Sequence, residues 1–400
     1  MIKKEKIYKV GGVVRDQLMN ISCNDIDYVV VNTTKEEMKE NGFKPVGANA
    51  QVFLHPETNE EYALARKEIS TGDSYHDFDF IYEGVTIEED LLRRDLTINA
   101  IAMDLKGNLI DPTNGQEDIK NKTLRHTTEA FKEDPLRLIR LARFYAKFTD
   151  FKVHPETINL CKEISKSGML KAVTNNKLGE ILIKTIKDST RPSRFFYFLE
   201  EVNALEILFP SIHALIGQTQ PEQWHPEGDS FVHTMLVMDK TREMTDDVET
   251  IIASLLHDLG KGITPKELLP KHHGHEESGV PLVEEFCQRF QFNKRQKKLA
   301  VFVCRNHLKV HRINELRSGK LYHFLKELRI FQDDSFFDKL IICCRADDMG
   351  KKNTDYLSEK YINDIKKVLL SEKPVKPKNH QVIEQFYVRK LNNYFKEIGK

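Results

Sequence analysis

Long apolar segments and paired cysteines are both missing from this 400-residue sequence. No apolar run approaches the ~20 residues that a membrane-spanning helix needs, and the N-terminal residues contain no apolar stretch followed by a cleavage site. The six cysteines form no CxxC pair, which is typical of reduced and mostly buried thiols. These absences predict a cytoplasmic protein that has no membrane segment.

A net charge is missing as well, because 61 Lys and Arg residues balance 61 Asp and Glu residues. A neutral chain is poorly suited to coating DNA indiscriminately, since such binding depends on neutralising phosphates. Local basic surfaces can still bind RNA while acidic catalytic sites cancel them in the total. The first 130 residues also lack the GxGxxG pattern of dinucleotide-binding folds and the GxxxxGK[ST] pattern of P-loops.

Hydrophobic periodicity divides the chain near Asp134. Before this point, short β-branched runs indicate strands at 7–14, 26–31 and 51–66. Residues 70–80 are rich in Gly, Ser and Asp and are typical of a mobile loop. After Asp134 the helical period predominates. We therefore expect an α+β head followed by all-α neck, body and tail regions, at 1–130, 131–210, 211–370 and 371–400.

Two carboxylates, Asp25 and Asp27, lie at alternate positions of a predicted strand. Alternate side chains of a strand share a face, so both should point the same way. Adjacent acids repel each other and are stabilised by holding Mg²⁺ through oxygen ligands. Such a centre supports a displacement at an α-phosphate. Taken alone, the pair is more typical of a solvated turn.

Two further segments add phosphate-binding groups. Gly11 and Gly12 allow the backbone to approach a phosphate, and Arg15 can neutralise it, although an ordinary glycine turn is the alternative. Arg94 and Asp95 lie in a charged run beside an apolar stretch, which predicts a cleft rather than a solvated face. There Arg94 can hold a triphosphate and Asp95 can accept a hydrogen bond from a ribose hydroxyl.

A polar stripe is predicted on the first long helix, because residues three apart are neighbours on a helix. Aspartate accepts hydrogen bonds and arginine donates them. Cytosine and adenine each present an amino donor beside a ring-nitrogen acceptor, whereas uracil and guanine reverse this order. An Asp–Arg pair therefore suits C and A and leaves unpaired groups against U and G. An exposed, salt-bridged helix is the alternative for the four stripe residues, Asp134, Arg137, Arg140 and Arg143.

In this order and spacing, GGVVRD, NDIDYVVV, RRDLTINA and EDPLRLIRLARF resemble the class II tRNA nucleotidyltransferases. These belong to the polymerase-β-like nucleotidyltransferases, which include bacterial poly(A) polymerases. The resemblance implies template-independent addition of CCA to tRNA from CTP and ATP, with Mg²⁺ on Asp25 and Asp27. It implies base reading by Asp134 and Arg137 and a ribose contact by Asp95. Nucleotide contacts are implied for Gly12, Arg15, Arg94, Arg140 and Arg143.

The same resemblance assigns residues 66–80 to a flexible loop that switches the enzyme from C to A addition. One position departs from the pattern, since Lys177 stands where the family usually has arginine. A poly(A) polymerase of the same family shares the head motifs and remains open.

A second cluster combines imidazoles and carboxylates from distant segments, which suits a divalent metal. It resembles the HD phosphohydrolase superfamily, whose H…HD…D pattern falls on His233, His257, Asp258 and Asp347. Lys261 and His275 are expected near the substrate phosphate. The metal, Ni²⁺ or Mg²⁺, would lower the pKa of a bound water. A purely structural histidine cluster is the alternative.

An HD body behind such a head resembles the bacterial multifunctional CCA-adding enzymes. This implies 2′,3′-cyclic phosphodiesterase, 2′-nucleotidase and phosphatase activities, which clear damaged 3′ ends. The expected partners are tRNA, CTP and ATP, with no membrane, and both a monomer and a homodimer stay open. A further alternative is an HD phosphohydrolase that uses its head only to bind RNA.

Overall fold

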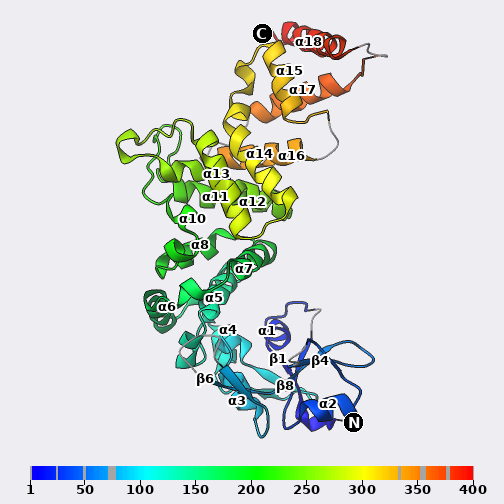
Figure 1. Cartoon of the computed structure of the whole chain (residues 1–400), viewed down its shortest axis with the longest axis vertical. Coiled ribbons are helices and arrows are strands. Elements are labelled where there is room, and N and C mark those ends of the chain that lie inside the picture. Colours follow the sequence, from blue (N-terminus) through cyan, green and yellow to red (C-terminus); the bar gives the residue numbers. More distant parts are fainter. Residues whose placement is uncertain are drawn as a thin grey trace. The chain divides into compact units, whose positions relative to one another are not determined.

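The computed structural model describes residues 2–23, 26–47, 51–70, 78–331, 335–351, 357–374 and 379–399. The chain packs into two compact units (Figure 1). The first comprises Met1–Val173 with Glu201–Ala204, and the second comprises Thr174–Glu200 with Leu205–Lys400. The predicted region boundaries at 130, 210 and 370 remain predictions.

A mixed sheet forms the base of the first unit, with strand order β3-β4-β5-β2-β1-β8-β9 among the described residues. Strands β2 and β5 are parallel, and the other neighbours are antiparallel. The strand bounds are β1 (Ile7–Val10), β2 (Asp27–Val30), β3 (Lys44–Pro45), β4 (Val52–Leu54), β5 (Glu61–Leu64), β8 (Ala102–Asp104) and β9 (Leu109–Ile110).

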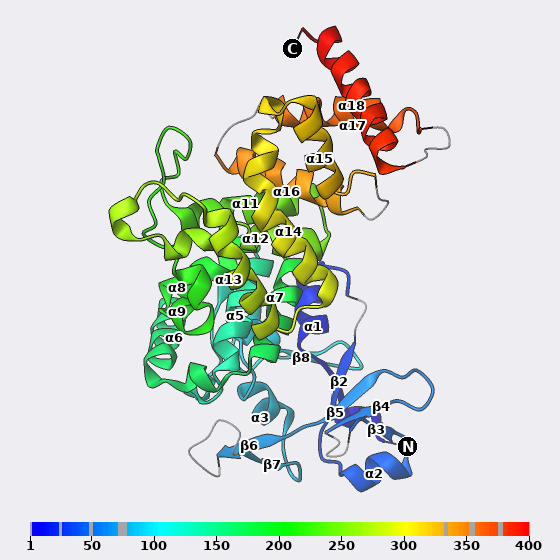
Figure 2. The ribbon, with the colours of Figure 1, turned by 45° about the horizontal axis from the view of Figure 1, so that its top comes forward.

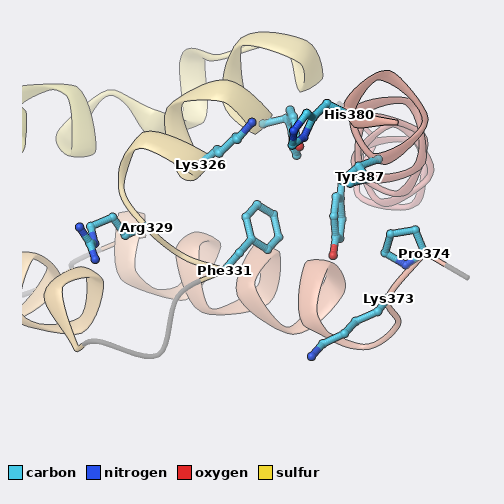
Figure 3. A pocket seen from close by; sticks show the side chains of 9 residues that line it. Lys326, Arg329, Phe331, Lys373, Pro374, His380 and Tyr387 are labelled. Carbon is cyan, nitrogen blue, oxygen red and sulfur yellow. The ribbon is translucent and has the colours of Figure 1, made fainter. Parts of the chain in front are cut away.

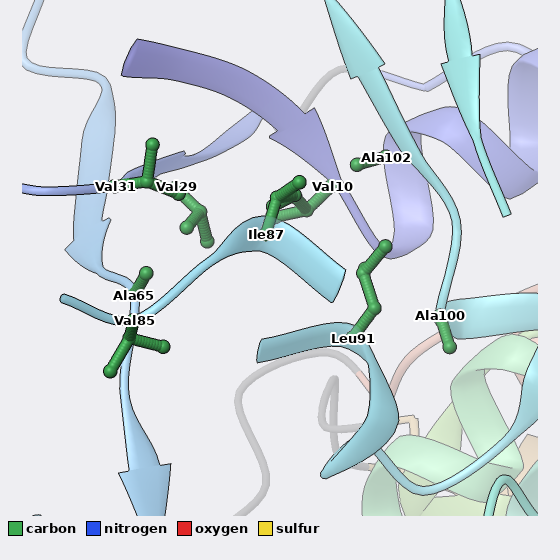
Figure 4. Close-up of a cluster of buried hydrophobic side chains, with 9 residues drawn as sticks. All are labelled: Val10, Val29, Val31, Ala65, Val85, Ile87, Leu91, Ala100 and Ala102. Carbon is green, nitrogen blue, oxygen red and sulfur yellow. The ribbon is translucent and has the colours of Figure 1, made fainter. Parts of the chain in front are cut away.

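Alternation along β2 gives the sheet two apolar faces. Val29 and Val31 enter one cluster, which Ile87 and Leu91 of α3 (Ile87–Leu92) cover (Figure 4). Tyr28 and Val30 point to the opposite face, into a cluster that includes Met38 of α2 (Lys35–Glu40). Both faces of β2 are therefore buried, which explains its continuous run of β-branched residues.

Two expectations for this region need correction. The strand predicted at 7–14 ends at Val10, because Gly11 turns the chain with a φ of +71° and α1 (Gly12–Leu18) begins directly after it. The segment expected to be a loop at 70–80 contributes to a hairpin of β6 (Lys67–Ser70) and β7 (Phe78–Ile81), which pair in antiparallel fashion. Residues 71–77 lie outside the described residues.

Helices carry the rest of the first unit. These are α4 (Gly115–Lys120), α5 (Leu136–Lys147) and α6 (Pro155–Ser167), with a small parallel pair of strands, β10 (Thr123–Leu124) and β11 (Lys152–Val153). Helix α5 begins directly after Pro135, as the sequence predicts.

The described part of the second unit is helical (Figure 2). Its centre is formed by α11, α12, α13, α14 and α16, which pack on one another. Side-chain caps start three of these helices, with Asp229 before α11, Asp247 before α12 and Asn293 before α14. The helix bounds are α7 (Asn175–Asp188), α8 (Ser193–Glu201), α9 (Leu205–Leu208), α10 (Pro210–His213), α11 (Ser230–Met244), α12 (Val248–Leu256), α13 (His275–Arg289), α14 (Lys294–His311), α15 (Ser318–Glu327), α16 (Phe336–Gly350), α17 (Leu357–Leu370) and α18 (His380–Glu397).

The expected fold class, an α+β head followed by a helical remainder, is confirmed. Among the helices that the structure describes, none is long and apolar enough to cross a membrane. The prediction of mostly buried thiols also holds, since five cysteines are buried, namely Cys161, Cys287, Cys304, Cys343 and Cys344.

Candidate functional sites

Three of the head motifs meet at one edge of the sheet. Strand β1 runs antiparallel to both β2 and β8. Its C-terminal end therefore lies beside the first residues of those two strands. Gly11 and Gly12 follow β1, Asp27 begins β2, and the segment 93–101 leads into β8. The register thus gathers segments that are far apart in the sequence.

The predicted carboxylate pair is only partly described. Asp27 is the first residue of β2, and its side chain is exposed. It lies opposite Glu61 of the parallel strand β5. Asp25 lies outside the described residues, so the shared face of the two carboxylates remains a prediction.

A chain of polar contacts links α1, the turn before β8 and α5. Arg15 donates through Nη1 to Asn99 Oδ1 at 2.6 Å, and Asn99 Nδ2 donates to Asp95 Oδ1 at 3.0 Å. Arg140 then donates from Nε to Asp95 Oδ2 at 2.7 Å. Asp95 and Arg15 are buried, at 6% and 4% exposure, whereas the Arg140 side chain is half-exposed. The motifs are thus joined through their own charged groups.

Asp95 is ionised and strongly held in this chain. Burial acts to raise the pKa of its carboxyl, but the charge of Arg140 and the hydrogen bonds from Asn99, Arg140 and the Leu96 amide outweigh burial and lower the pKa to about 2. Arg15 is enclosed in another way, since its guanidinium pairs with Asp16 at 2.7 Å and lies over the rings of Phe144 and Phe148. The nucleotide contact expected of Arg15 stays a prediction.

Asp90 holds the two arginines that follow α3. This fully buried carboxylate accepts from Arg93 Nη2 at 2.7 Å and from Arg94 Nη2 at 3.1 Å. It also accepts from the Arg66 amide, at 3.3 Å, just before β6. A Cβ on Gly11 would lie 3.1 Å from Arg94 Nη1, so glycine leaves room for Arg94 beside the turn after β1. Sequence reasoning missed Asp90, because no local pattern distinguishes it from a solvated acid.

The helix predicted to carry the polar stripe is present as α5, but the four residues predicted to form the stripe have different surroundings. Arg137 is buried and donates to the Ala130 carbonyl at 2.9 Å. Asp134 precedes the helix and accepts the Leu136 amide at 2.9 Å. Arg143 lies over the Phe144 ring, with 4.3 Å between its guanidinium carbon and the ring centre. Base reading by Asp134 and Arg137 remains a prediction.

Lys177, the departure from the family pattern, lies in the second unit. It is in the first turn of α7, where its ammonium group is 2.9 Å from the Glu180 carboxylate. Both side chains are about half-exposed. An exposed pair of this kind contributes little to stability.

The second unit brings the predicted metal ligands together in its interior. His233 lies on α11, His257 ends α12, Asp258 follows it, and Asp347 lies on α16. His233 Nε2 is 3.0 Å from Asp347 Oδ1, and His257 Nε2 is 3.1 Å from Asp258 Oδ2. All four side chains are almost fully buried. Such a donor set fits a divalent cation, since buried carboxylates and imidazole nitrogens need a partner.

His275 and His307 extend this cluster on its other side. Their Nε2 atoms lie 3.1 Å and 3.4 Å from Asp258 Oδ1. The short helical turn that carries Asp258 approaches α13 closely, because a Cβ on Gly260 would overlap the His275 carbonyl. Burial lowers the pKa of His307 to about 4, although Asp258 opposes this shift. His307 was missed by the sequence analysis.

Positively charged side chains lie beside both Asp258 and Asp347. Lys261 Nζ is 2.6 Å from Asp258 Oδ2 and donates to Gln220, and Lys351 Nζ is 2.8 Å from Asp347 Oδ1. His311 Nε2 is 2.7 Å from Asp347 Oδ2. Burial acts to lower the pKa of His311, but Asp347 prevails and raises it to about 9. Lys261 therefore lies within the cluster, and its contact with the substrate phosphate remains a prediction.

Comparison with known protein families finds two domains, in the same order along the chain as the two sites described above. Residues 7–125 match the poly A polymerase head domain, and residues 230–347 match the HD domain. Among solved structures, the apo form II of a CCA-adding enzyme has a TM-score of 0.63 and 20% identity, covering 96% of this chain and 88% of that one. A Thermotoga maritima CCA-adding enzyme complexed with tRNA also has a TM-score of 0.63 and 20% identity, covering 97% and 87%. At this identity the likeness concerns the fold.

Sequence relatives are closer. The multifunctional CCA protein of Teredinibacter turnerae is 45% identical over 349 residues, which cover 86% of this chain and 85% of that protein. That of Shewanella denitrificans is also 45% identical over 349 residues, covering 86% and 84%. With this identity over nearly the whole length, and with both domains matched in order, the chain belongs to the family of multifunctional CCA proteins.

Proposed function

We propose that this protein adds CCA to the 3′ end of tRNA from CTP and ATP. The observation that carries the proposal is the convergence of Asp27, the Gly11–Gly12 turn and the Arg15–Asn99–Asp95–Arg140 chain of contacts at one sheet edge. These groups supply what nucleotidyl transfer needs, namely carboxylate for metal and guanidinium for phosphate. Membership of the multifunctional CCA proteins supports the same assignment.

In the proposed reaction, the tRNA 3′-hydroxyl attacks the α-phosphate of CTP twice and then of ATP, and pyrophosphate leaves. Asp25 and Asp27 would hold Mg²⁺, which when bound stabilises the negative charge at the reacting phosphate. Arg94, which Asp90 holds beside Gly11, would bind the triphosphate. Asp95 would contact the ribose while it also positions Arg140.

Base selection by Asp134 and Arg137 would require both side chains to offer groups to the nucleotide. Arg137 donates to the Ala130 carbonyl and Asp134 accepts the Leu136 amide, so both side chains lie at the start of α5. Arginine offers only donors and aspartate only acceptors, which is the pattern that complements the ring-nitrogen acceptor and amino donor of C and A.

Incubation with tRNA that ends at the discriminator base, with Mg²⁺ and labelled nucleotides, tests this function. We expect two CMP additions followed by one AMP addition, and no addition by the Asp27→Ala variant. Long A tracts on unrelated RNA would instead support a poly(A) polymerase. No incorporation, with phosphate still released from cyclic ends, would leave the head as an RNA-binding module.

We also propose a metal-dependent phosphohydrolase activity for the second unit, supported by its buried histidines and carboxylates. Its substrates would be 2′,3′-cyclic phosphodiesters and 2′-nucleotides at damaged RNA ends. Lys261 would stabilise negative charge near Asp258. Phosphate release after loading with Ni²⁺ or Mg²⁺ would identify the active metal. Loss of release in Asp258→Asn, with CCA addition retained, would separate the two activities.

A cavity near the C-terminus would contribute to tRNA binding. It has a volume of about 400 Å³ and lies among α15, α18 and the segment before Pro374 (Figure 3). The Phe331 and Tyr387 rings lie 4.6 Å apart, and Lys326 and Lys373 flank the rings. Among the described residues that line it, none is acidic. Exposed cations beside aromatic rings suit RNA, whose phosphates and bases they contact.

A further inference from the structure

An exposed aromatic side chain lies next to the buried cluster of the second unit. Trp224, the one tryptophan of the chain, is 65% exposed in the segment between α10 and α11. The ring of the next residue, His225, lies 4.7 Å from that of His233, measured between ring centres. We propose that Trp224 stacks on the base of the RNA 3′-terminal nucleotide whose phosphoester the second unit hydrolyses. The proposal rests on the phosphohydrolase function and adds the residue that recognises the nucleoside.

The turn that carries Trp224 is closed by backbone hydrogen bonds. Exposure alone does not indicate a binding surface, since single apolar side chains are common on protein surfaces. Here, however, the amides of Trp224 and His225 both donate to the Pro221 carbonyl, at 3.0 and 2.9 Å. The Gln220 amide donates to the Gly228 carbonyl at 2.9 Å and joins the two ends of the loop. The exposed ring is thus carried by an ordered turn, which lowers the entropic cost of binding a ligand.

The residues before Trp224 connect this turn to the cluster. Lys261 Nζ donates to Gln220 Oε1 at 2.6 Å, and the same ammonium group lies 2.6 Å from Asp258 Oδ2. Gln220 is buried, whereas Trp224 is exposed. The segment therefore leads from the cluster to the surface of the second unit within one loop.

The residues after Trp224 make a second connection. Glu227 Oε1 is 2.8 Å from His225 Nδ1 and 2.7 Å from His233 Nδ1. These three side chains are largely buried, and that of His225 is 14% exposed. Trp224 thus lies between two segments that both reach the cluster. A nucleotide whose phosphate enters the cluster has its base beside this turn.

An indole ring suits an RNA end for a reason of specificity. Every base has a π face, so stacking on an aromatic side chain accepts A, C, G and U alike. This tolerance fits a hydrolase that clears damaged ends, because such ends finish at different nucleotides. The polar groups of the cluster then act on the phosphoester, while Trp224 supplies affinity that does not depend on the base sequence.

Two substrates that differ only in the base test the proposal by kinetics. The full chain, loaded with the metal that supports its hydrolysis, is compared on 2′,3′-cyclic CMP and on the 2′,3′-cyclic phosphate of methyl riboside, which has no base. Phosphorus NMR follows the opening of both rings. We expect Trp224→Ala to raise the KM for cyclic CMP about 10-fold with little change in kcat, and to have little effect on the KM for the riboside.

Two further variants separate stacking from a structural role. Trp224→Phe retains an aromatic ring and should restore most of the affinity for cyclic CMP. Gln223→Ala is the matched control, because Gln223 is the exposed neighbour in the same turn, and it should behave as wild type. An equal rise in KM for both substrates in Trp224→Ala would show that the side chain only supports the turn, and it would overturn the proposal.

Fluorescence gives a readout that does not need activity. Because Trp224 is the one tryptophan of the chain, the tryptophan emission reports on this side chain alone. We expect 3′-CMP to quench the emission, whereas inorganic phosphate at the same millimolar concentration leaves it unchanged. Emission that 3′-CMP also leaves unchanged would overturn the stacking, even if cyclic ends are hydrolysed. Quenching by 3′-CMP without hydrolysis of either substrate would refute the phosphohydrolase function and retain the base-binding role of Trp224.

Discussion

Replacing Asp95 by asparagine should destabilise the first unit at neutral pH and have little effect in strong acid. The side chain keeps its size and its contact with Asn99, but the charge that holds Arg140 is removed. The carboxyl pKa of about 2 lies nearly two units below its usual value, and this difference corresponds to about 2 kcal/mol. Because the Arg140 side chain is half-exposed, solvent screens the ion pair, and the expected loss of stability is at or below this figure.

The pH dependence follows from the direction of the shift. A carboxyl whose pKa is depressed by folding stabilises the native state fully above its unfolded pKa, near 4, and loses this contribution as pH falls through its folded pKa. The difference between wild type and Asp95→Asn should therefore be constant from pH 7 to about pH 5 and should shrink between pH 4 and pH 2.

Cys161 provides a local assay, because it is fully buried in α6 of the same unit. Labelling of Cys161 in urea by a disulfide reagent that reacts in acid reports unfolding of this unit. Mass spectrometry identifies which cysteine is labelled. Glu61→Gln is the control, since Glu61 is exposed on β5. A loss that is absent at pH 7, or equally large at pH 2.5, would show that the Asp95–Arg140 pair does not hold this unit together.

Asp90→Asn should raise the KM for CTP and ATP roughly 10-fold, about 1.4 kcal/mol of binding, because Arg94 loses the charge that positions it; an unchanged KM would refute this role. Gly11→Ala should destabilise the first unit by about 1–2 kcal/mol, because its left-handed backbone disfavours a Cβ. Gly107→Ala, where φ is +91° and a Cβ would meet open space, carries this backbone cost without a clash with Arg94. A comparison of the two variants in nucleotide-binding assays therefore isolates the effect of the clash. Lys326→Glu with Lys373→Glu should weaken tRNA binding at least 10-fold and reduce its salt dependence, as measured by filter binding; a variant that binds tRNA as tightly as wild type at both about 50 mM and about 200 mM salt would exclude the cavity.

Local patterns indicated candidate residues for each site, but they did not predict how those residues pair. The segment 134–144 predicts a helix, and a helix, α5, is present there. The same pattern cannot show that Arg140 binds Asp95, because the two lie 45 residues apart in the sequence. It likewise cannot show that Arg15 is enclosed by Asp16 and two phenylalanines. Such pairings depend on how β1, β8 and α5 pack.

The HD cluster shows the same limit for a metal site. The adjacent His257 and Asp258 are evident in the sequence, whereas His307 occurs in an ordinary helical segment. Its one signal is the spacing to His311, four residues on, which places both imidazoles on one face of α14. The structure gives them separate partners, Asp258 for His307 and Asp347 for His311. One helix face thus contacts both carboxylates of the cluster, and the spacing alone does not show which carboxylate each imidazole contacts.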